Sequence, residues 1–125
     1  MAEQQHAQIL VVDDEEPIRE LLTRILGDEG YGVDVAGNVE EALDSLAAGS
    51  TDLILLDLHM PGPYDGEELL FLLRDRGDEV PIIIVSGWVD DEAAMSHPEC
   101  VHAVLKKPIH SSALIEAVRQ ALGPG

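Results

Sequence analysis

Acidic residues follow two apolar segments of this sequence, at positions where they could act together. Asp13 and Asp14 come directly after Ile-Leu-Val-Val, and Asp57 comes directly after Leu-Ile-Leu-Leu. Such apolar runs are typical of buried strands in a parallel sheet. If the two strands are neighbours, three carboxylates meet at one edge of the sheet, where their repulsion is costly unless a cation offsets it. Carboxylate oxygens are good ligands for Mg2+, so we expect a magnesium ion at this edge.

Two further residues could complete a site for phosphoryl chemistry. Ser86 follows the apolar segment 81–85, and Lys107 follows closely on the segment 101–105. A carboxylate can attack a phosphoryl group to give an acyl phosphate, and Asp57 is the best-placed nucleophile. Lys107 would offset the charge of the transferring group, and the Ser86 hydroxyl could donate a hydrogen bond to one of its oxygens.

The segments that must position these residues alternate between strand and helix patterns. Five short segments predict strands, at residues 8–13, 32–36, 53–57, 81–85 and 101–105. Helical spacing of apolar residues predicts five helices. The first runs from Pro17 to Gly27 and Gly30, and the second follows the cap residue Asn38. The third begins at about Gly66, the fourth spans residues 90–96, and the last carries apolar residues from Leu114 to Leu122. This order indicates a doubly wound α/β domain, with a parallel sheet covered by helices on both faces.

Length and charge limit the possible classes of protein. The 125 residues suit one domain, spanning 1–125 with its core at about 8–122. Twenty-five acidic residues against seven basic ones give a formal net charge of -18, so neither nucleic acid nor an anionic membrane is an expected partner. No apolar run approaches the length of a membrane span, and residues 1–6 lack signal-peptide features, so we expect a cytoplasmic protein. The single Cys100 excludes an internal disulfide.

The motifs at the strand ends resemble those of the receiver domains of bacterial two-component response regulators. The resemblance covers residues 8–122 and is carried, in order, by residues 11–14, 56–61, 65–66, 85–87 and 107–108. It implies a flavodoxin-like five-stranded sheet of order 2-1-3-4-5. It also implies that a histidine kinase or phosphotransfer protein passes a phosphoryl group from a phosphohistidine to Asp57 with Mg2+. The domain would then change its interactions with a downstream protein, and would catalyse no reaction beyond its own phosphorylation and dephosphorylation.

The same resemblance implies roles for individual residues. Asp14 and Asp57 would ligate the metal, Asp13 would assist through a water molecule, and the backbone carbonyl of His59 would be the third protein ligand. Ser86 and Lys107 would contact the phosphoryl group. The family places its functional lysine directly before a proline, which is the position of Lys107, so the neighbouring Lys106 is expected to be solvated.

The sequence departs from the family pattern in ways that bear on signalling. The loop at 62–64 has three residues where two are usual, and Val104 stands where an aromatic residue is common. A β-branched valine cannot reproduce the swing of a large ring. We therefore expect phosphorylation to move the loops after the third and fourth strands, with little packing change at Val104. A partner would read that end of the sheet, including His59, Tyr64 and Trp88.

Other functions are possible for an acidic strand end in such a fold. A phosphatase with an aspartate nucleophile would need a second acid two residues later, where His59 stands. A flavodoxin-like cofactor module would need small residues after the first strand, where the acidic residues 13–16 would repel phosphate. A receiver that acts as an interaction module without phosphorylation is a third alternative. The histidines near Cys100 fit no standard structural zinc spacing.

Overall fold

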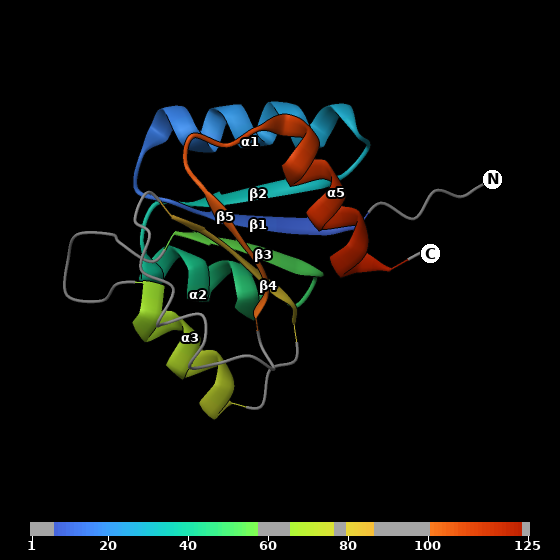
Figure 1. The fold of residues 1–125 in the computed structure, drawn as a ribbon. Coiled ribbons are helices and arrows are strands. Elements are labelled where there is room, and N and C mark those ends of the chain that lie inside the picture. Colours follow the sequence, from blue (N-terminus) through green and yellow to red (C-terminus); the bar gives the residue numbers. More distant parts are fainter. Residues whose placement is uncertain (1–6, 58–65, 77–79, 87–100, 124–125) are drawn as a thin grey trace.

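Five short strands form the centre of the fold, and each arises from one of the segments predicted as strands (Figure 1). The computed structural model describes residues 7–57, 66–76, 80–86 and 101–123. Within this part of the chain the elements are, in order, β1 (Gln8–Val12), α1 (Glu16–Asp28), β2 (Gly32–Ala36), α2 (Val39–Ala47), β3 (Leu53–Asp57), α3 (Gly66–Asp75), β4 (Ile82–Ser86), β5 (Val101–Lys106) and α5 (Ser111–Leu122).

The strands form one parallel sheet of order β2-β1-β3-β4-β5, which confirms the predicted topology. Figure 1 shows α1 and α5 on one face of the sheet and α2 and α3 on the other. The described residues contain four of the five expected helices. The predicted helix at 90–96 lies outside the described residues, as do the loop at 62–64 and Trp88.

Two hydrophobic clusters, one on each face of the sheet, form the core. The cluster beneath α1 and α5 contains the strand residues Ile9, Val11, Leu53, Leu55, Ile83 and Val85. The cluster beneath α2 and α3 contains the strand residues Leu10, Val12, Ile54, Leu56, Ile82 and Ile84. Because neighbouring residues of a strand point to opposite faces, the runs 9–12 of β1 and 53–56 of β3 are apolar at every position and pack against both layers. Each fully buried aliphatic side chain of this size stabilises the fold by about 1.5–3 kcal/mol.

Several predicted boundaries shift by one residue or more. The first strand ends at Val12 rather than at residue 13, and β4 and β5 each extend one residue beyond the predicted 81–85 and 101–105. Helix α1 begins at Glu16, one residue before Pro17, and runs through Gly27. The chain leaves α1 at Gly30, whose φ of 95° lies in the left-handed region where glycine is favoured.

The expected cap of the second helix is confirmed. The Asn38 side chain accepts a hydrogen bond from the backbone N–H of Glu41 at 2.8 Å, and the Glu41 carboxylate in turn accepts one from the Gly37 N–H at 2.7 Å. These bonds satisfy donors that would otherwise lack partners at the helix start. Val104 of β5 is half-buried and packs against the cluster beneath α2 and α3. Among the described residues, no helix has the length and apolar character needed to cross a membrane.

Candidate functional site

Strand alternation brings Asp13, Asp57 and Lys107 to the same face of the sheet at its carboxyl edge. Side chains two residues apart on a strand point the same way. Each of the three residues follows, by two positions, a side chain that packs beneath α1 and α5, namely Val11, Leu55 and Leu105. Val12 pairs with Leu56, so Asp13 and Asp57, which follow them in the chain, lie side by side. The fold therefore delivers two carboxylates and one ammonium group to one place.

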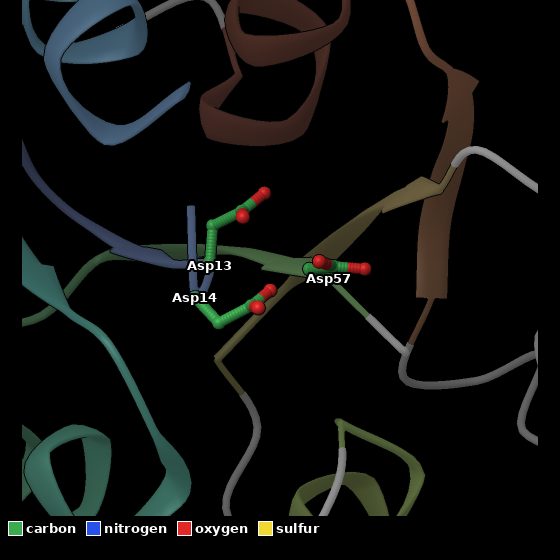
Figure 2. Close-up of side chains that lie close together, drawn as sticks. All are labelled: Asp13, Asp14 and Asp57. Atoms are coloured by element: carbon green, nitrogen blue, oxygen red, sulfur yellow. The ribbon is translucent and has the colours of Figure 1, made fainter. Parts of the chain in front are cut away.

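The carboxylates of Asp13, Asp14 and Asp57 form a compact cluster at the ends of the adjacent strands β1 and β3 (Figure 2). One oxygen from each of them lies within 4.8 Å of the others, close enough for a single metal ion to contact all three. Asp13 is 1% exposed and Asp57 is 4% exposed, whereas Asp14 is half-buried. Carboxylate oxygens at such spacing repel one another strongly when they share a site of low dielectric.

Lys107 places its ammonium group between the two buried carboxylates. Its Nζ lies 3.1 Å from Asp13 Oδ2 and 3.4 Å from Asp57 Oδ2, and its side chain is 17% exposed. Burial by itself lowers the pKa of Lys107. The close contact with the Asp13 carboxylate and the charges of Asp57, Asp13 and Glu15 outweigh that effect and raise the pKa of Lys107 above its ordinary value of 10.5. The amine is therefore charged at neutral pH, and it offsets one of the three negative charges.

Asp13 is held by contacts from four directions. Its N–H donates to the carbonyl of Ala36 at 3.0 Å, its Oδ1 accepts from the N–H of Glu15 at 2.9 Å, and its own carbonyl accepts from Arg19 Nη1 at 2.7 Å. The remaining atom, Oδ2, is buried and accepts no hydrogen bond of good geometry among the described residues, although it makes the ion pair with Lys107. A buried carboxylate oxygen with this little compensation is suited to a metal or to a water molecule bound to one.

The other predicted site residues are described only in part, or lie outside the described residues. Ser86 is the last residue of β4 and pairs with Lys106 of β5, one position beyond the pairing of Asp57 with Val85. It therefore stands at the same edge of the sheet, although its side chain is not described. His59 lies outside the described residues. Lys106 is exposed, as expected.

Arg19 contacts this site but was not expected from the sequence. Its guanidinium binds a backbone carbonyl, and such a contact leaves no pattern in residue types. The available signal was its position, since an arginine in the first turns of a helix can reach back to the residues that precede the helix.

Comparisons with known proteins agree on one family. Residues 9–119 match the family model of the response regulator receiver domain. The nitrogen assimilation regulatory protein NtrX of Azorhizobium caulinodans is 35% identical over 116 residues, which cover 91% of this chain and 26% of that protein. The response regulator MprA of Mycolicibacterium vanbaalenii is 43% identical over 80 residues, covering 64% of this chain and 34% of that protein. This chain thus spans about a quarter to a third of the length of these curated relatives.

A solved structure of similar size shows the same fold. The response regulator TrrA of Thermotoga maritima, in complex with Mg2+-BeF, aligns with a TM-score of 0.82 and 36% sequence identity. The alignment covers 93% of this chain and 99% of that chain. Nearly the whole of that protein is therefore similar to this one in both fold and sequence.

Proposed function

Because this chain belongs to the family of response regulator receiver domains, whose members are phosphoacceptor signalling domains, we propose that its phosphoacceptor is Asp57. The phosphoryl group would come from the phosphohistidine of a histidine kinase or phosphotransfer protein, and phosphorylation would change the binding of a downstream protein. Residues 1–125 would form a single receiver domain with its core at 8–122. The only reactions assigned to the domain are its own phosphorylation and dephosphorylation.

The proposed reaction is a direct transfer to the carboxylate. An oxygen of Asp57 attacks the phosphorus, the bond between phosphorus and the imidazole nitrogen breaks, and its electron pair stays with the imidazole, which takes up a proton. The product is an acyl phosphate. The Lys107 ammonium, 3.4 Å from Asp57 Oδ2, is available to pair with the phosphoryl oxygens. We assign the Ser86 hydroxyl to a hydrogen bond with one of these oxygens, from the place of Ser86 at the end of β4.

Mg2+ is the cofactor that fits the donor set. We assign its ligands to Asp14, Asp57 and the backbone carbonyl of His59, with Asp13 bound through water. Bound there, the ion would neutralise charge on the carboxylates and on the phosphoryl oxygens. Three observations support this assignment: the carboxylate oxygens lie within 4.8 Å of one another, Asp13 Oδ2 is buried without a hydrogen bond among the described residues, and the similar protein TrrA was solved with Mg2+-BeF.

One observation carries the proposal furthest: a single ammonium group lies within ion-pair distance of two buried carboxylates, one of which is the expected phosphoacceptor. Transfer of a phosphoryl group depends mainly on positioning and charge neutralisation, and this arrangement supplies both. The family match favours neither the phosphatase nor the cofactor module. It does not favour the unphosphorylated interaction module either, and the sequence has Asp57, Ser86 and Lys107 at the positions that we assign to phosphoryl chemistry.

Intact-mass spectrometry tests the assignment of Asp57. Incubation with acetyl phosphate and Mg2+ should add the mass of one phosphoryl group to the protein, and Asp57→Asn should take up none. Asp44→Asn is the matched control, because it removes an exposed carboxylate of α2 by the same substitution and should be labelled like the parent protein. Equal labelling of Asp57→Asn would refute the site. A parent protein that is never labelled would favour the interaction module.

A further inference from the structure

Arg19 occupies a junction where four elements meet beside the acidic cluster. It belongs to the first turns of α1, and its Nη1 donates a hydrogen bond to the carbonyl of Asp13, just after β1, at 2.7 Å. Its guanidinium also reaches the turn between β2 and α2, because a Cβ built on Gly37 would lie 3.2 Å from Arg19 Nη1. The side chain is half-buried. A charged side chain in such a place serves a defined contact rather than general solubility.

The bond to the Asp13 carbonyl acts on Asp14 through the peptide that joins the two residues. The peptide unit is planar, so fixing the carbonyl of one residue fixes the plane from which the next residue departs. Among the described residues, the Asp14 side chain has no hydrogen bond or ion pair that could orient its carboxylate. The place from which this side chain extends therefore depends on the backbone, and Arg19 holds that backbone.

A second observation on the same contact concerns the space beside Gly37. A contact of 3.2 Å is tighter than most contacts of a real Cβ, so any side chain at position 37 would push the guanidinium aside by a few tenths of an ångström. The Gly37 N–H donates a hydrogen bond to the Glu41 carboxylate at 2.7 Å, and this bond restrains the turn from moving away from Arg19. The Arg19 guanidinium therefore fits at this place because Gly37 has no side chain.

We infer that Arg19 is a positioning residue for the metal site: by holding the Asp13 carbonyl, it fixes the backbone from which the Asp14 carboxylate reaches Mg2+. This inference rests on the proposed Mg2+ site. An arginine suits the role because its planar guanidinium stays charged and directs donors in fixed directions.

Calorimetric titration of the full chain with Mg2+ tests this role without any phosphoryl chemistry. Arg19→Met keeps the length of the side chain but removes the donor and the charge. It should weaken Mg2+ binding by roughly ten-fold, the lower range for loss of a group that orients a metal ligand. Arg24→Met is the matched control. Arg24 lies on the same helix, and Arg19 and Arg24 both line a surface groove of about 450 Å3 between α1 and β2. Arg24 is exposed, however, and has no contact with the acidic cluster among the described residues.

A second variant separates positioning from charge. Gly37→Ala keeps every charge and should weaken Mg2+ binding by crowding the guanidinium. The double variant should bind no more weakly than Arg19→Met alone, because both changes act on one contact and their effects should not add. Melting temperatures without Mg2+ show that each variant is folded before it is titrated.

The outcomes distinguish this inference from the function on which it rests. If the parent protein binds no Mg2+, the proposed function fails, and the inference fails with it. If the parent binds Mg2+ and Arg19→Met binds it equally well, or no worse than Arg24→Met, the function stands and the role of Arg19 is refuted. Additive effects of Arg19→Met and Gly37→Ala would refute the shared contact.

Discussion

Lys106 and Lys107 are neighbours in the chain but lie in different environments. Lys106 ends β5 and is exposed, whereas Lys107 has a side chain only 17% exposed and contacts Asp13 and Asp57. The difference follows from strand alternation, because Lys107 continues the series of residues that pack beneath α1 and α5 through Leu105. A shift of one residue would exchange the two lysines between these environments.

Comparison of Lys107→Ala with Lys106→Ala tests this difference between the two lysines. Loss of Lys107 removes the cation beside the phosphoacceptor, so phosphorylation by acetyl phosphate should slow by roughly ten- to hundred-fold. Without Mg2+, the free energy of unfolding should also fall by about 1–3 kcal/mol, because two buried carboxylates lose the charge between them. Rates of labelling and urea unfolding measure both effects. Lys106→Ala should change neither, and an equal or larger effect from Lys106 would reverse the assignment.

Residue types predicted the acidic cluster well and the supporting contacts poorly. Asp13, Asp14 and Asp57 were found because each follows an apolar run, and strand ends of a parallel sheet share one edge. Arg19 was missed because it donates to a carbonyl group, which every residue possesses. Contacts of side chains with the backbone depend on helix orientation, and that orientation emerges only when the layers pack.

At the scale of elements, the strands were predictable because both faces of the sheet are covered. Continuous apolar runs are needed for β1, β3 and β4, and the connecting helices have clear periodicity. The ends were less predictable. β1 ends at Val12, and just beyond it the Asp13 carboxylate accepts from the Glu15 N–H where the chain turns toward α1. The irregular register of β4 and β5 between Ile82 and Ile83 leaves no mark in the sequence pattern.

The start of α2 is the element boundary that the sequence predicted in most detail. Asn38 followed by Glu41 indicates a capping residue and its partner, and both side chains do bind backbone N–H groups at the helix start. The same turn carries Gly37, the neighbour of the Arg19 guanidinium. The cap therefore stabilises both the helix and the turn beside the site.

The prediction for this element is that Asn38→Ala lowers the free energy of unfolding by about 1 kcal/mol, because the Glu41 N–H loses its acceptor. Asn38→Asp is the control, since it keeps an acceptor oxygen in place and should cost much less. Urea unfolding, with the slope compared between variants, measures the change. Equal destabilisation by both substitutions would show that the cap contributes little and that position 38 matters for another reason.

At the scale of the whole molecule, the dominant feature is a formal net charge of -18 on 125 residues. Such an excess destabilises the folded state through repulsion between carboxylates, and salt screens it. Ion pairs relieve it locally. In the described residues Lys107 pairs with the cluster, and Arg119 of α5 pairs with Glu29 at the end of α1 at 3.0 Å. The pair on the surface contributes little, so cations from solution should matter more.

The last prediction separates general screening from a bound ion. With a dissociation constant in the millimolar range, as expected for a site with few protein ligands, about 10 mM Mg2+ should stabilise the fold by about 1–2 kcal/mol and raise the melting temperature by roughly 5 °C. Sodium chloride at equal ionic strength should give a smaller rise, because it screens charge without occupying the cluster. Asp14→Ala should remove the excess over sodium chloride, since it deletes a proposed ligand, whereas Asp44→Ala, which removes an exposed carboxylate of α2, should retain it. Equal rises with both salts, or an unchanged excess in Asp14→Ala, would place the effect of Mg2+ in the overall charge of the molecule and not in this site.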